Sequence, residues 1–461
     1  MTDRYSGTFP KCCFLGAVGI QRLNRPQPSS AEVLFSPKQG LSVTQIQALT
    51  HRKDSHMFQM IQQFVIISCL FGSVSAIRAA EPVTWLVLSS MDDQVFPSLV
   101  YSMANLKKET VKAGGKSVYR TPADMAIFQT FAKTPLAIRF SRLAPGSRAS
   151  VRVKADAVME PLSMSVDLTK TQLLKLPVAF RYDALLTIRQ SKPVDISISV
   201  SVDGGPYRSQ TKTVTFRSVN ECPYFVFTSP AEDRGYDLRW MFAAYVNEDH
   251  PLVDQILKDA LGTKIVTSFD GYQSKNVDQV RAQVRAVWTA LCLRGVRYSS
   301  ITASANRSAI ARSQHVRLLD ESVKSDQANC VDGSVLIASV LEKIGIETAL
   351  VKIPGHMFLQ FWLDPWLGDA RKHYVCLETT LMGEGFPLPA KSTKSKAIEV
   401  ADASYVRAWT LANQTFDKNS KNIHSNSDGG FGLINITEAR KRGIIPIPYV
   451  RQSPAIAPQG K

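Results

Sequence analysis

The chain lacks the short motifs that identify several common enzyme classes. It contains no pair of cysteines at metal-binding spacing and no phosphate-binding P-loop. Neither a cysteine-ligated zinc site nor nucleotide-dependent chemistry is therefore indicated. His373 has no cysteine or histidine partner at ligand spacing, which argues against a zinc site around it. We predict a protein that works without a metal or another cofactor.

Acidic side chains are fewer than basic ones. The 461 residues include 55 Lys and Arg against 39 Asp and Glu, which gives a formal net charge of +16. A basic protein favours acidic partners such as cell-wall polymers, anionic membranes or nucleic acid. No basic stripe interleaved with aromatic residues is present, so nucleic acid is not an expected partner. A basic, solvated surface without any such partner is the simpler alternative.

A hydrophobic run long enough to cross a bilayer is also missing. The apolar core at 64–71 is too short for a transmembrane helix. It follows the basic residues 52–53 and precedes small residues at 73–76 and 79–80. This layout is typical of a secretory signal peptide, which we place at 57–80. An internal buried helix is the alternative interpretation.

The position of this signal peptide suggests a late start. A signal peptide belongs at the beginning of a chain, so Met57 or Met60 is the expected initiator, and 1–56 is predicted to be a non-native extension. The residues ending at Cys69 also resemble a bacterial lipobox. The apolar run before Cys69 is too short and continues past it, which argues against lipidation. We therefore expect a secreted or cell-envelope protein that contacts the membrane only through its signal peptide.

Three segments follow. Residues 82–220 are predicted to be mostly β, because 196–202 strictly alternates apolar and polar residues and turn residues follow it. Several such strands favour an immunoglobulin-like sandwich, which we interpret as a spacer. Residues 221–382 mix helices and strands. Residues 383–461 are expected to pack on that second segment without forming a domain of their own.

Apolar spacing predicts several elements within the last two segments. A short helix is expected at 251–261 and a longer one at 277–293. A long polar connector, 299–325, precedes the next helix and could face a substrate. Further on, 401–411 is predicted to be helical and 417–430 to be a polar loop.

A cysteine, a histidine and a carboxylate follow one another in the second segment. Cys330 opens a predicted helix that Asn329 caps, with Asp332 completing the capping box. The first turn of a helix favours a thiolate, although the charge of Asp332 opposes it. His356 begins a predicted strand, and Glu378 lies on the next one. The three residue types match a nucleophile, its base and the group that orients the base.

Whether these side chains meet depends on the faces of the last strand. Tyr374, Cys376 and Glu378 are predicted to share one face. If the Cys330 helix covers that face, Glu378 can reach His356. The same arrangement would also permit a Cys330–Cys376 disulfide, which would remove the nucleophile.

Four motifs in this region resemble a known family. Asn-Cys-Val-Asp at 329–332, Ile-Gly-Ile at 344–346, Pro-Gly-His-Met-Phe at 354–358 and Leu-Glu-Thr-Thr at 377–380 occur in that order. Together they are similar to the transglutaminase-like domain of the papain-like cysteine enzymes, over roughly 275–382. This form of the motifs also resembles that of a group of secreted bacterial proteins.

The resemblance implies both a fold and roles for these residues. The fold would be α+β, with the cysteine helix packed on an antiparallel sheet. Cys330 would be the nucleophile, His356 the base and Glu378 the orienting group. Glu378 replaces the family's Asp and is one methylene longer, so the geometry of the histidine–carboxylate pair must differ. Thr379 replaces the family's Pro.

We therefore expect a secreted cysteine enzyme that cleaves or transfers amide bonds in a protein or peptide substrate. Hydrolysis is favoured over crosslinking, because water is always available. Gln327 could help to bind an oxyanion with the backbone of Cys330, or could be a solvated loop residue. Two alternatives stay open: an inactive extracellular binding module on the same fold, and a structural protein of the cell envelope.

Overall fold

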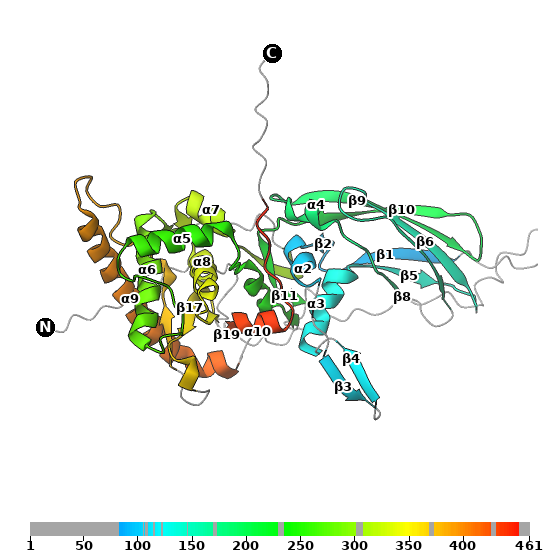
Figure 1. Ribbon diagram of the computed structural model, residues 1–461. Coiled ribbons are helices and arrows are strands. Elements are labelled where there is room, and N and C mark those ends of the chain that lie inside the picture. The colour runs from blue at the N-terminus through cyan, green and yellow to red at the C-terminus, as the bar shows by residue number, and fades with distance from the viewer. Residues whose placement is uncertain are drawn as a thin grey trace, which may run out of the picture. The chain divides into compact units, whose positions relative to one another are not determined.

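The computed structural model describes residues 83–450 except 105, 107–108, 114–115, 121–122, 145, 169–172, 229–234, 301–307, 368–372 and 426–429. The predicted N-terminal extension, signal peptide and lipobox lie outside the described residues. From residue 83 onward the chain belongs to one compact unit of mixed helices and sheets (Figure 1), in agreement with the predicted α+β class. None of the helices in the described part combines the length and apolar character that a membrane crossing requires.

Two β-sheets of three or more strands occupy the first part of the described chain. The larger has the strand order β2 (Gln94–Val95), β10 (Arg208–Phe216), β9 (Lys192–Val202), β6 (Arg148–Lys154) and β7 (Leu162–Asp167). The smaller has the order β1 (Thr84–Ser89), β5 (Leu136–Ser141) and β8 (Leu173–Leu176). Neighbouring strands are antiparallel except for β2 and β10.

The two sheets bury a common hydrophobic core. Alternate residues of β9, namely Ile196, Ile198 and Val200, lie in it together with Val87 and Ile138 of the smaller sheet. The alternation predicted for β9 is therefore confirmed, because a strand with one buried face has a side-chain period of two. Two sheets that share a core agree with the mostly β character predicted for this segment.

Shorter elements interrupt the β segment. They are α2 (Pro97–Ser102), β3 (Glu109–Ala113), β4 (Lys116–Arg120), α3 (Ala123–Lys133) and α4 (Tyr182–Leu186). Phe96, Leu99, Met125 and Phe128 belong to the hydrophobic core of the residues that follow the sandwich. The β segment therefore contributes to the packing of the second half.

A four-stranded antiparallel sheet organises the second half. Its strand order is β18 (Tyr374–Leu377), β17 (His356–Trp362), β16 (Thr348–Ile353) and β19 (Gly432–Asn435). Two helices, α8 (Cys330–Lys343) and α9 (Lys394–Ser425), contact this sheet (Figure 1). Leu336 of α8 shares a core with Leu359 of the sheet. Phe416 of α9 shares a different core with Phe358 and Cys376, so α8 and α9 cover opposite faces.

The remaining elements surround this core. They are β11 (Glu221–Phe227), β12 (Gly235–Asp237), η3 (Arg239–Tyr245), α5 (Pro251–Gly262), α6 (Val277–Leu293), β13 (Arg297–Tyr298), β14 (Ala311–His315), α7 (Leu319–Lys324), β15 (Gln327–Ala328), η4 (Pro365–Leu367), η6 (Thr379–Leu381) and α10 (Ile436–Lys441). The helix predicted at 277–293 is α6, with bounds that agree at both ends. Its N-cap Asn276 accepts hydrogen bonds from the backbone of Asp278 and Gln279, which fixes the first turn.

Two predicted loops are wrong. The connector at 299–325 contains β14, which pairs with β11, and also α7. The polar composition of this segment gave no sign of β14, because that strand is stabilised by pairing with β11, which is distant in sequence. The loop predicted at 417–430 is helical as far as Ser425, because Phe416 and Ile423 continue the buried stripe of α9 at helical spacing.

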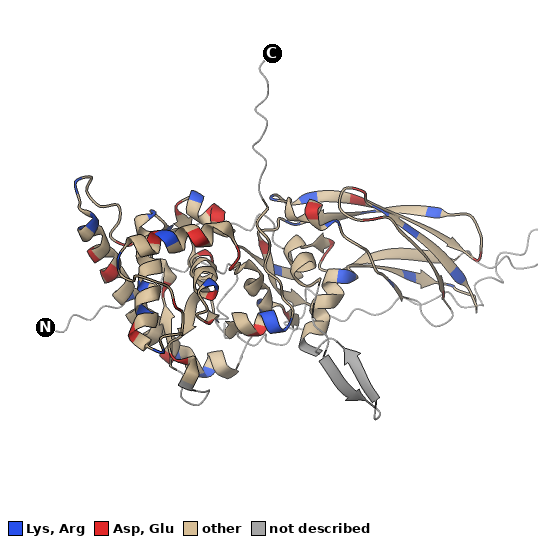
Figure 2. Cartoon of the chain, in the orientation of Figure 1, with Lys and Arg blue, Asp and Glu red and all other residues tan. Residues whose placement is uncertain are grey.

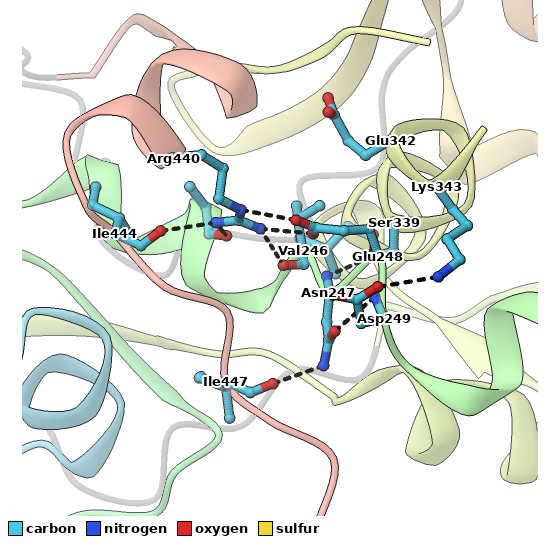
Figure 3. A network of polar contacts seen from close by, with 12 residues as sticks. Val246, Asn247, Glu248, Asp249, Ser339, Glu342, Lys343, Arg440, Ile444 and Ile447 are labelled. Carbon is cyan, nitrogen blue, oxygen red and sulfur yellow. Dashed lines mark hydrogen bonds and ion pairs between the residues drawn. The ribbon is translucent and has the colours of Figure 1, made fainter. Parts of the chain in front are cut away.

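Polar contacts tie the C-terminal segment to the core. Arg440 of α10 donates to the carbonyl of Val246 at 2.6 Å and forms an ion pair with Glu248 at 3.0 Å. The side-chain amide of Asn247 donates to the carbonyl of Ile447 at 2.9 Å. Figure 3 shows these contacts converging between α10, the residues after η3 and the end of α8. The chain beyond the four-stranded sheet thus returns to pack against residues 246–248, which follow η3.

Candidate active site

Cys330 is the first residue of α8, and a capping box fixes it there. The Asn329 side chain accepts from the backbone N–H groups of Val331 at 2.8 Å and Asp332 at 2.9 Å. The Asp332 carboxylate accepts in return from the N–H of Asn329 at 3.1 Å. The predicted capping box is therefore confirmed. Cys330 is fully buried where the helix dipole favours a negative charge.

Asp332 forms an ion pair with Arg317, which the sequence analysis did not predict. Its buried carboxylate accepts from the backbone N–H of Arg317 at 2.8 Å and from the guanidinium of Arg317 at 2.7 Å. Burial raises the pKa of Asp332, while hydrogen bonds from Asn329 and Arg317 and the charge of Arg317 oppose that rise. The predicted repulsion between Asp332 and a Cys330 thiolate is thus offset, because Arg317 supplies a compensating positive charge.

His356 and Glu378 form a buried pair. His356 Nε2 lies 2.7 Å from Glu378 Oε2, and Glu378 is fully buried. The other carboxylate oxygen accepts from the Thr380 hydroxyl at 2.7 Å and from the Thr380 N–H at 3.1 Å. Both oxygens of Glu378 are therefore engaged. The predicted contact between the histidine and the carboxylate is present.

The position of Glu378 differs from the prediction by one residue. Strand β18 ends at Leu377, and Glu378 is the N-cap of η6. Its side chain accepts from the Thr380 backbone as a capping residue does, while it also reaches His356. One carboxylate thus anchors the turn and orients the imidazole.

The residue after Glu378 joins this pair to the start of α8. The Thr379 hydroxyl donates to the carbonyl of Cys330 at 3.2 Å, and the Ser334 hydroxyl donates to the same oxygen at 2.6 Å. A Cβ added at Gly333 would lie 2.9 Å from Cβ of Thr379, so glycine allows η6 to approach the helix. The structure therefore connects the segments that carry Cys330 and Glu378 through direct contacts.

Cys376 does not bridge to Cys330. It is a free, buried cysteine on the face of the sheet that α9 covers, and Gln360 Nε2 lies 3.7 Å from its sulfur. The Cys330 helix does not cover the Cys376 face of the sheet, because α9 packs there. Cys222 and Cys292 are also free and buried.

The other described cysteines have environments that suppress reactivity. Burial raises the pKa of Cys292 to about 11 and that of Cys376 to about 12, and it raises the pKa of Cys222 well above its usual value. A thiol with such a pKa is a poor nucleophile at neutral pH. Among the described cysteines, only Cys330 begins a helix.

Two other polar residues noted in the sequence are Gln327 and His373. Gln327 is half-buried on the short strand β15, which pairs with β13, and no polar contact among the described residues joins its side chain to Cys330. His373 Nδ1 lies 2.6 Å from a carboxylate oxygen of Asp364. Within the described part of the chain, no cluster of three or more His, Cys, Asp and Glu side chains could hold a metal ion.

Sequence reasoning missed the residues that support the site. Arg317 and Ser334 lie outside the four motifs, Thr379 attracted notice only as a replacement for proline, and Thr380 was given no role. Polar residues near a motif are too common to single out without knowing which of them are buried.

The chain was also compared with known proteins. No family model and no curated protein matches it.

Proposed function

We propose that this protein is a secreted, transglutaminase-like cysteine enzyme that cleaves or transfers amide bonds. The observation that carries the proposal is the buried His356–Glu378 pair at 2.7 Å beside a helix that begins with Cys330. The four-stranded sheet covered by α8 would be a papain-like core, and the two sheets before it an immunoglobulin-like sandwich that acts as a spacer. The fold class alone would not support this proposal, because one fold hosts many functions.

The proposed reaction begins with attack by the Cys330 thiolate on an amide carbonyl carbon. Glu378 engages Nε2 of His356 and leaves Nδ1 as the nitrogen that exchanges a proton with the thiol. As the C–N bond breaks, the imidazolium gives its proton to the departing amine, and a thioester forms. Water then attacks the thioester, His356 takes up a proton from that water, and the thiolate leaves. With an amine in place of water, the same steps transfer the acyl group.

A specific observation favours a second candidate, an inactive binding module on the same fold. Cys330 is fully buried in this structure, and a buried sulfur cannot reach the carbonyl of a protein substrate. The enzyme proposal therefore requires the Cys330 sulfur to become accessible when substrate binds.

A measurement of substrate turnover distinguishes the enzyme from the inactive binding module. The reduced protein and Cys330→Ala would each be incubated with a complex peptide mixture, and the products read by mass spectrometry. New peptide termini, conversion of glutamine to glutamate, or crosslinks that require Cys330 would identify a peptidase, an amidase or a crosslinking enzyme. Identical product lists for the two proteins would favour the binding module.

A further inference from the structure

The outward face of the larger β-sheet carries small hydroxyl side chains. Alternate residues of its strands point into the core, and the residues between them point outward. Outward serines and threonines include Ser150, Ser163, Ser165, Ser197, Ser199, Ser209, Thr211 and Thr213. One carboxylate, Asp195, lies on the same face and accepts from the Thr213 hydroxyl at 2.6 Å. We refer to these serines and threonines, with Arg152, Lys154 and Tyr207, as the hydroxyl face.

Strand register arranges this face as a regular array. Two rows of directly paired residues cross the sheet: Ser163, Arg152, Ser199 and Ser209 in one, and Lys154, Ser197 and Thr211 in the other. Strands lie about 4.8 Å apart and alternate residues about 6.8 Å apart along a strand. Hydrogen-bonding groups therefore repeat in two directions.

Two cations stand within the array. Arg152 and Lys154 are exposed, and neither forms an ion pair with an acidic side chain among the described residues. By contrast, Arg148 on the same strand lies 3.8 Å from Asp167. The Arg152 guanidinium lies 4.2 Å from the centre of the Tyr207 ring, which is 41% exposed. Stacking on the ring holds the guanidinium in place at the surface.

Strand stability alone does not account for this composition. Threonine favours strands, but serine is not among the residues enriched in them. Some hydroxyls pair across strands, as Ser199 and Ser209 do at 2.8 Å. Ser163 and Ser197 instead lie exposed, directly across from the two cations.

We propose that the hydroxyl face binds an anionic polysaccharide. Such a polymer offers hydroxyl groups for the serines, carboxylate or phosphate groups for Arg152 and Lys154, and a sugar face for Tyr207. A peptide strand would use a sheet edge and apolar pockets, and this face is polar. Single-stranded nucleic acid would need a series of aromatic platforms, and the face has one. This proposal does not depend on the activity of Cys330.

The test is affinity electrophoresis of the full chain through gels that contain polygalacturonate, its methyl ester or a neutral glucan. Arg152→Gln with Lys154→Gln removes both cations. The matched control is Arg139→Gln with Lys175→Gln, which makes the same charge change on the outer face of the smaller sheet. A third variant, Ser163→Val with Ser197→Val, keeps strand-favouring residues but removes two hydroxyls.

We expect retardation by polygalacturonate and little by the other two polymers. The Arg152/Lys154 variant should bind about threefold to tenfold more weakly, as expected for the loss of two exposed charge contacts. The Ser163/Ser197 variant should also bind more weakly, and the Arg139/Lys175 control should match the parent protein. Absence of retardation would overturn the proposal. Equal loss in both charge variants, or full binding by the serine variant, would do so too, because either would indicate attraction by net charge alone. Equal retardation in a fourth gel that contains single-stranded DNA would indicate nucleic acid instead.

Discussion

The Glu378 carboxylate has two roles at the residue scale. One oxygen lies 2.7 Å from His356, and the other accepts from Thr380. The buried carboxylate stabilises a positively charged imidazole, because opposite charges interact strongly away from water. It also holds the ring in one orientation through Nε2.

Glu378→Gln keeps the shape of the side chain but removes its charge. The imidazolium then loses its stabilising partner, and alkylation of reduced Cys330 near pH 6 should slow by about 100-fold or more. Rates measured by mass spectrometry of the Cys330 peptide would check this. Glu160→Gln, which breaks an exposed ion pair with Arg181, is the control and should leave the rate unchanged. An unchanged rate in Glu378→Gln would remove this residue from the proposed triad.

Arg317 and Asp332 form the second important pair at this scale. Arg317→Met should destabilise the fold by about 3–5 kcal/mol, because it leaves a buried carboxylate uncompensated. Adding Asp332→Asn should recover much of that loss. Arg407→Met, at an exposed ion pair with Glu384, should cost less than about 1 kcal/mol. Urea unfolding would measure all three changes, and equal effects of Arg317→Met and Arg407→Met would contradict this account.

At the scale of elements, the site depends on the contact between α8 and η6. Gly333 faces Thr379 so closely that an added methyl group would be crowded. Gly333→Ala should therefore destabilise the protein by about 1–3 kcal/mol, although alanine favours helices. Gly262→Ala is the matched control, because space is open around that helical glycine. A stabilising effect of Gly333→Ala, read from thermal unfolding, would show that η6 can move away without cost.

Helices and strands with regular apolar spacing could be predicted from the sequence. The elements that each of them packs against could not. Helix α6 and the alternating strand β9 follow directly from apolar spacing, and the cap of α8 follows from Asn329 and Asp332. The face of the sheet that each helix covers does not follow, since Cys376 proved to lie under α9. The role of Arg317 depends on a loop that returns to α8, and local sequence carries no information about that approach.

At the scale of the whole molecule, basic and acidic side chains are interspersed on the described helices and strands. Figure 2 shows them mixed on the helices of the second half, without a continuous basic stripe. The net charge of +16 therefore points to a generally basic surface more than to a nucleic-acid groove.

Global stability should also depend on the titration of Glu342. Burial raises the pKa of this carboxyl from 4.5 to about 7, and Thr348 donates two hydrogen bonds to it. The folded state therefore binds the proton more tightly than the unfolded state does. The protonated Glu342 carboxyl therefore contributes to the stability of the folded state. That stability is fully present below pH 4.5 and is lost as pH rises through about 7.

Glu342→Gln should remove that dependence. Relative to the parent protein, the variant should gain about 1–3 kcal/mol between pH 5 and pH 8, measured by urea unfolding. Glu399→Gln, at an exposed position of α9, should leave the slope unchanged. Parallel stability curves for the parent and Glu342→Gln would contradict the assignment.

The central claim is that Cys330 and His356 form an activated pair, and the pH dependence of Cys330 alkylation tests it most directly. The reduced protein and His356→Ala would be treated with iodoacetamide across pH 5–9, and the Cys330 peptide quantified by mass spectrometry. We predict that Cys330 of the parent protein reacts well below the usual thiol pKa of about 8.5, whereas in His356→Ala reactivity appears only near that value. Identical profiles for the two proteins, or no reaction at Cys330 after reduction, would contradict the enzyme proposal.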